Sequence, residues 1–262
     1  GRRMEADPRR IGNYHVLPQL SRSKAGDRWL ARDERTDSVL VLHWLALHPP
    51  REGPRRVGPR LEALQRLRHA HLLSIDGVIP GVASASPGRW LVTPYTGRHA
   101  GLITLDQLQR EKGGTMPVVE VERALLHLLE ASEYAHGQGV CHGVVDPGDV
   151  QVDRRGSLLI ELYGLERALA SERTSAGEVI RDEVRSIVAT GYHLITGLSP
   201  DEPRLRVGKL IRQLDPAWDD WFDMGLDASG GFRSAQEALG LLPSARGVPE
   251  STAAPIMVKT MV

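Results

Sequence analysis

The first third of the chain alternates short apolar stretches with polar turns, which is typical of a small antiparallel sheet. The alternation predicts five strands, at residues 14–20, 28–32, 39–45, 72–79 and 89–93. Leu61, Leu64 and Leu67 recur at helical spacing and predict one helix, which ends near His69. A proline-rich stretch at 49–59 should break the chain before that helix.

After Pro94 the apolar residues recur with a helical period, which indicates a mostly helical second part. Helices are predicted at 104–112, 117–136, 218–224 and 233–241, with a buried helix from Val184 to Gly197 and a short hairpin at 150–152 and 158–162. We therefore divide the chain into four parts. They are an N-terminal extension (1–10), an N-lobe (11–94), a C-lobe (95–242) and a C-terminal tail or linker (243–262).

The charge and the apolar content narrow the function classes. The chain has 262 residues, with 33 basic and 33 acidic side chains, so no positive excess points to a nucleic-acid partner. No apolar run reaches the ~20 residues of a membrane span, so we expect a cytoplasmic chain, or the cytosolic domain of a larger or membrane-anchored protein. A single cysteine, Cys141, excludes a disulfide framework. Of the basic residues 29 are arginines, a codon bias that indicates a bacterial source.

Several strings stand in a characteristic order along the chain. They are LARDERTDSVLVLHWL, LEALQRLRHAHLL, LLEASEYAHGQGVCHGVVDPGDVQVD, LLIELYGLERAL and DEVRSIVATGYHLITGLSP. In this order they resemble the landmarks of a bacterial, Hanks-type Ser/Thr protein kinase, over about residues 11–242. The resemblance implies an α+β, bilobal protein-kinase-like fold. It has a small antiparallel five-stranded N-lobe with one helix, a larger and mostly helical C-lobe, and a shortened activation segment.

The same resemblance implies that the polar catalytic positions are substituted. They are the strand-three lysine (His43), the catalytic base (Val144), the loop lysine (Asp146), the metal-binding asparagine (Asp149) and the magnesium-binding aspartate (Leu162). Removing one preorganised electrostatic group from an active site costs on the order of 3 kcal/mol. Asp146 and Asp149 would also repel a triphosphate, since the lysines and magnesium that normally offset such charges are missing.

The resemblance places a degenerate nucleotide pocket at ten positions. They are Ser21, Ser23, Gly26, Arg28, Val41, His43, Thr93, Pro94, Thr96 and Gln151. Arg28 stands where a valine covers the base, and Gln151 stands where a leucine lies beneath it. Ser21 and Ser23 replace two glycines of the phosphate loop, so side chains occupy space that the phosphates would need. The hinge backbone at 94–96 could still contact a base, so nucleotide binding without metal stays open.

The positions that support the lobes structurally are kept. The resemblance assigns His142 and Tyr163 to the apolar spine between the lobes, Gly164 to the turn, and Glu183 to the support of the catalytic-loop backbone. Only 19 positions separate Gly164 from Glu183, too few for an ordinary activation segment. Gly143 replaces the loop arginine that would bind a phosphorylated activation loop.

We therefore expect a catalytically inactive pseudokinase domain, not an enzyme, without cofactor or metal ion. It would act as a protein-interaction scaffold or allosteric regulator for an unidentified protein partner, and self-association stays open. The alternative is an atypical nucleotide-binding switch, or a residual phosphotransferase that uses His43, Asp146 and Asp149. Residues 51–68 hold six arginines and two glutamates, which is typical of a solvated helix face and leaves an anionic docking surface as the second interpretation.

Overall fold

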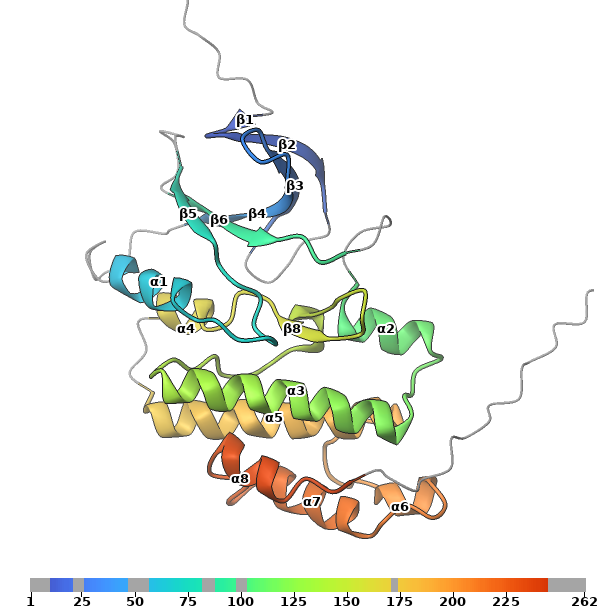
Figure 1. Ribbon diagram of the computed structural model, residues 1–262. Coiled ribbons are helices and arrows are strands. Elements are labelled where there is room, and N and C mark those ends of the chain that lie inside the picture. The colour runs from blue at the N-terminus through green and yellow to red at the C-terminus, as the bar shows by residue number, and fades with distance from the viewer. Residues whose placement is uncertain are drawn as a thin grey trace, which may run out of the picture.

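The computed structural model describes residues 10–20, 26–46, 57–81, 88–97, 103–170 and 174–244. They form two lobes, with a curled sheet above a helical body (Figure 1). The N-lobe elements are β1 (Arg10–Ile11), β2 (Tyr14–Gln19), β3 (Arg28–Asp33), β4 (Val39–Ala46), α1 (Val57–Gln65), β5 (Gly77–Pro80) and β6 (Gly88–Pro94). The sheet is antiparallel, with the order β1-β2-β3-β4-β6-β5.

The sheet has six strands, so the expectation of five was wrong. The added strand, β1, is two residues long, and Arg10 and Ile11 pair with His15 and Tyr14 of β2. Two residues cannot show an alternating pattern, so nothing in the sequence distinguished β1 from the extension assigned to residues 1–10.

The strand expected at 72–79 is also displaced, because β5 begins only at Gly77. Leu72 instead makes an isolated parallel bridge to Ile160 of the C-lobe, and Leu73 donates its backbone N–H to the Ile160 carbonyl. Leu72, Leu73 and Ile75 are all buried, so this apolar run fills the space between the lobes. A short apolar run predicts burial but does not identify the structure that buries it.

Helix α1 begins earlier than predicted, inside the stretch interpreted as a breaker. It starts at Val57, so Pro59 lies in its first turn, where the missing N–H has no intrahelical partner to lose. The helix ends at Gln65 rather than near His69. Leu61 and Leu64 are its buried residues, as their spacing predicts, whereas the rest of the expected breaker lies outside the described residues.

The C-lobe is built around two long antiparallel helices. Its helices are α2 (Leu105–Glu111), α3 (Val118–Gly137), α4 (Leu165–Leu169), α5 (Ala176–Thr196), α6 (Val207–Leu210), α7 (Ala217–Leu226) and α8 (Ala235–Gly240). A short 3-10 turn, η1 (Pro147–Asp149), leads into the hairpin of β7 (Val150–Val152) and β8 (Leu158–Ile160). The sequence predicted all of these except α4, α6 and η1, which are one or two turns long.

Helix α5 shows how local sequence sets the frame of this lobe. Ser175 accepts a hydrogen bond from the Glu178 backbone N–H while the Glu178 side chain accepts one in return, a capping box that starts the helix before the predicted Val184. Gly197 ends the helix with a left-handed φ of 70°. A Cβ at Gly191 would lie 2.7 Å from Leu125 Cδ2, so glycine there lets α5 pack closely on α3.

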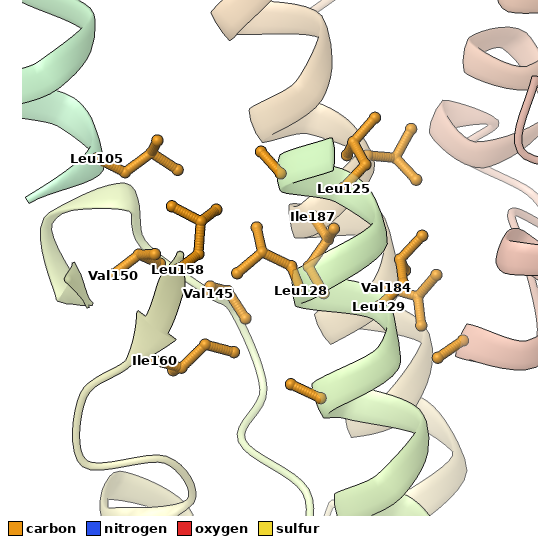
Figure 2. Packing of buried hydrophobic residues seen from close by; sticks show 14 of the residues in the cluster. Leu105, Leu125, Leu128, Leu129, Val145, Val150, Leu158, Ile160, Val184 and Ile187 are labelled. Carbon is orange, nitrogen blue, oxygen red and sulfur yellow. The ribbon is translucent and has the colours of Figure 1, made fainter. Parts of the chain in front are cut away.

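The core lies between these two helices and the β7–β8 hairpin. Leu125, Leu128 and Leu129 of α3 face Val184 and Ile187 of α5, and the hairpin contributes further aliphatic side chains on the side of α3 toward the N-lobe (Figure 2). All five of these side chains are at most 1 % exposed. The hairpin thus packs on the buried side chains of α3, and its residues can place polar side chains against the N-lobe. No described helix combines the length and the apolar character needed to cross a membrane.

Candidate site between the lobes

A buried ion pair joins the two lobes at the place where the resemblance puts the nucleotide. Arg28 of β3 donates from Nη1 to Oε2 of Glu161, which follows β8, at 2.8 Å. Both side chains are 2 % exposed. Gln151 of β7 donates from Nε2 to the same oxygen at 2.6 Å. The positions expected above and beneath a base are therefore connected through one carboxylate. We call this contact the interlobe ion pair.

The two charges of the interlobe ion pair depend on each other. Moving an ionised group out of water costs several kcal/mol unless a partner compensates it. Burial raises the pKa of Glu161, and the guanidinium of Arg28 works in the opposite direction.

Glu161 was not among the predicted site residues. A lone glutamate after an apolar strand resembles the start of a surface turn, and no local pattern connects it with an arginine 133 positions away.

His43 of β4 lies in the same buried cluster, directly across the sheet from Arg28. Its Nε2 is 2.8 Å from Oγ1 of Thr93, and its Nδ1 is 3.9 Å from Oε1 of Glu161. Burial, helped by the positive charge of Arg28, lowers the pKa of His43 to about 3. The imidazole is therefore neutral at physiological pH, so it adds no positive charge beside the ion pair.

The neutral state of His43 can be measured. We expect its imidazole ¹H and ¹⁵N NMR shifts to stay constant from about pH 5 to pH 8, whereas the same histidine in the denatured chain should titrate near ~6.5. Since the native pKa lies below the unfolded value, the unfolded state binds the proton first as the pH falls. This contribution to stability is complete above ~6.5 and is lost toward acid pH. A titration of the native resonance near neutral pH would contradict the burial of His43.

Below this cluster, Glu183 of α5 organises the polypeptide around His142. Glu183 is fully buried, and its carboxylate accepts hydrogen bonds from the backbone N–H groups of His142 (2.8 Å) and Gly143 (3.2 Å). The hydroxyls of Ser132 and Tyr163 donate to its other oxygen. Burial alone would raise the pKa of Glu183, but His136 and these donors outweigh it and lower the pKa.

The structural positions expected around this carboxylate lie together. The His142 and Tyr163 rings stack with centroids 5.1 Å apart, and the Gly164 N–H donates to His142 Nδ1 at 2.9 Å. Gly164 has a φ of 78°, and a Cβ there would lie 2.9 Å from Leu64 Cδ2 of α1. Glycine is thus required for the turn and for the close approach of α1.

The remaining predicted positions lie in different environments. Val144 is 64 % exposed, and Leu162 is buried with a φ of 50°, rare for a side chain of its size. Asp146 caps η1 by accepting from the Gly148 N–H, and Asp149 ends that turn. No group of three or more potential metal ligands occurs in the part of the chain that the structure describes.

The structure brings only some of the predicted nucleotide-pocket residues together. Arg28, His43, Thr93 and Gln151 lie in one buried network with Glu161. The other described pocket positions differ in their surroundings: Val41 is buried in the sheet opposite Thr93, Pro94 and Thr96 are half-buried, and Gly26 has a φ of 125°. Ser21 and Ser23 lie outside the described residues.

Known proteins resemble the chain in sequence and in structure, although no family model matches it. The Ser/Thr-protein kinase bur1 of Emericella nidulans is 23% identical over 192 residues, which cover 70% of this chain and 34% of the relative. CBL-interacting protein kinase 4 of Oryza sativa subsp. japonica is 29% identical over 190 residues, which cover 69% of this chain and 37% of the relative. The PknI kinase domain of Mycobacterium tuberculosis superposes with a TM-score of 0.68 at 21% identity, over 89% of this chain and 96% of that one.

These comparisons support a protein-kinase-like chain, related in sequence to Ser/Thr protein kinases and sharing their fold. The chain spans about a third of the length of the first curated relatives. Our expectation that the chain is not an enzyme is contradicted, because the relatives are named as Ser/Thr protein kinases, which are enzymes. The substituted residues suggested otherwise, but their assignment to catalytic roles rests on the resemblance alone.

Proposed function

We propose that this protein-kinase-like domain acts as a scaffold or allosteric regulator that contacts a protein partner, and that in this state its interlobe cleft is closed to Mg-ATP. The observation that carries the proposal is the interlobe ion pair. Arg28 and Gln151, from opposite lobes, share one oxygen of Glu161. A nucleotide entering between them would have to separate two buried charges, which costs several kcal/mol.

Phosphoryl transfer is the second candidate function, and the names of the relatives favour it. In this candidate the ion pair would open before nucleotide enters, and Asp146 and Asp149, which lie at the two ends of the η1 turn, would hold the metal ion. His43 would stand beside the phosphates as a neutral donor rather than as a cation, since burial keeps it unprotonated. The two candidates therefore differ in whether Mg-ATP binds to the domain as it stands.

A thermal-shift titration with ATP, alone and with Mg²⁺ or Mn²⁺, tests the proposal. A ligand at one hundred times its Kd stabilises a protein by about 2.7 kcal/mol, so binding is easily visible. We expect no shift for this domain and a clear shift for an active Ser/Thr kinase measured beside it. A metal-dependent shift, together with transfer of radiolabel from ATP to the domain or to a protein acceptor, would replace the first candidate with the second.

The setting of the domain is part of the same proposal. We propose a cytoplasmic, bacterial protein whose partner is another protein, without a nucleic-acid partner. Crosslinking and pull-down from native cells test this, and a specific complex should bury about 1,200–2,000 Å². Recovery of no specific protein partner would contradict it. Analytical ultracentrifugation of the purified chain then shows whether the partner is a second copy of the chain or a different protein.

A further inference from the structure

A cavity lies away from the interlobe ion pair, where α1 of the N-lobe meets α4 of the C-lobe. Its volume is ≈ 300 Å³. Arg60 of α1 and Arg167 of α4 line it, together with Leu64, Val140 and Ala168. Among the described residues, the lining contains two guanidinium groups and no carboxylate. We call it the arginine cavity.

The two arginines of this cavity are held in place by neutral acceptors. Arg60 donates from Nη1 to the carbonyl oxygens of Ala168 (3.2 Å) and Ala170 (3.3 Å). Arg167 donates from Nη2 to the carbonyl of Thr174. Within the part of the chain that the structure describes, neither guanidinium forms an ion pair with a carboxylate. These carbonyl contacts orient both side chains, and among the described residues no carboxylate compensates either positive charge.

From this arrangement we infer that the arginine cavity binds a carboxylate-bearing peptide segment of a protein partner. A guanidinium presents a planar fork of donors that fits a carboxylate, and such charge-assisted hydrogen bonds are about twice as strong as neutral ones. Leu64, Val140 and Ala168 offer an apolar floor for a short aliphatic side chain beside the acidic group. Arg60 also belongs to the arginine-rich stretch 51–68, whose second interpretation was an anionic docking surface.

This inference rests on the proposed regulatory role, because it names the surface that a partner would use. The cavity lies between α1 and α4, which contact each other across the two lobes. A peptide bound there touches both lobes at once. Its binding free energy would therefore depend on how the lobes are oriented, which is the requirement for an allosteric contact.

Fluorescence anisotropy with a short, fluorescein-labelled peptide rich in glutamate and leucine tests the arginine cavity. We expect this peptide to bind the wild-type domain more weakly as salt is added, since screening reduces the attraction. Its counterpart with glutamine at every glutamate should bind at least about tenfold more weakly. The double variant Arg60→Gln/Arg167→Gln should also lose about tenfold in affinity, whereas Arg66→Gln, an exposed arginine just beyond α1, should change it by less than about twofold.

Three outcomes would overturn the inference: no binding of the glutamate peptide to the wild-type domain, equal binding of the glutamine peptide, or equal losses in the double variant and in Arg66→Gln. The comparison of the two peptides uses the unaltered domain, so it holds even where the double variant fails to fold. Failure here is distinguishable from failure of the proposed function. Arg60 and Arg167 lie outside the interlobe ion pair, so a negative peptide result leaves the Mg-ATP titration unaffected.

Discussion

Arg28→Met should lower the free energy of unfolding of this domain by about 3–5 kcal/mol. The substitution keeps an unbranched apolar stem but removes the guanidinium, so it leaves the Glu161 carboxylate buried without its cation; both side chains of the pair are 2 % exposed. Gln151 alone supplies a neutral hydrogen bond to Glu161, which compensates a buried charge only in part. Urea denaturation followed by circular dichroism measures the loss directly.

The matched control for this variant is Arg32→Met, on the same strand. Arg32 pairs with Asp37 at 2.9 Å, but its side chain is 49 % exposed, so the loss should stay below about 1 kcal/mol. The double variant Arg28→Met/Glu161→Leu removes both buried charges and should be clearly more stable than Arg28→Met alone. Equal losses for Arg28→Met and Arg32→Met would contradict a buried interlobe ion pair.

The interlobe ion pair joins the two lobes, so the contact between the lobes contributes to the stability of the fold. Arg28 comes from the sheet, while Glu161 and Gln151 come from the β7–β8 hairpin that rests on the C-lobe core. Separating the lobes would therefore expose or isolate charges that are now satisfied. Under the proposed function, a partner that changes the lobe orientation would have to supply comparable free energy.

Much of the C-lobe could be predicted because its helices carry long, regular patterns. The apolar spacing in α3 and the glycine that ends α5 each specify a local structure on their own, whereas the start of α5 at its Ser175 cap was not predicted. The ranges of the N-lobe strands β3 and β4 were also predicted closely, although their pairing register was not. Where the expectation failed, as at β1 and at residues 72–79, the segment was too short or was buried by contacts from the other lobe.

The candidate site could be predicted only in part, because its key contact joins distant segments. The sequence indicated that Arg28 and Gln151 occupy a predicted pocket, since both side chains are larger or more polar than the resemblance requires. It could not indicate that Glu161 connects them, because 133 positions separate Arg28 from Glu161 and only the folded chain brings them within 2.8 Å. The arginine cavity could likewise be predicted only in part. Arg60 belongs to the arginine-rich stretch that the sequence analysis identified, whereas no sequence pattern indicated Arg167.

Replacing Glu183 with alanine should cost about 4 kcal/mol or more of unfolding free energy. Glu183 is fully buried, and its carboxylate accepts from the Ser132 and Tyr163 hydroxyls and from the backbone N–H groups of His142 and Gly143. Without it, these donors stay buried with no acceptor, at a cost of ~1–3 kcal/mol for each one that water cannot reach. Urea denaturation again measures the loss, and limited proteolysis should cut near His142 sooner in the variant.

Two control variants and the pH dependence separate this role from a general effect of altering α5. Asp182→Ala, at an exposed position next to Glu183, should change stability by less than about 0.5 kcal/mol. Glu183→Gln keeps one acceptor oxygen and should lose less unfolding free energy than Glu183→Ala.

Because the native pKa of Glu183 is lowered, the contribution of its carboxylate to stability is present above the unfolded pKa of ~4.5. It disappears as the pH falls through the lower native pKa. The difference between wild type and Glu183→Gln should therefore shrink below about pH 4, since protonation makes the wild-type carboxyl neutral as well. A constant difference down to pH 2 would mean that the charge of Glu183 does not hold the backbone around His142.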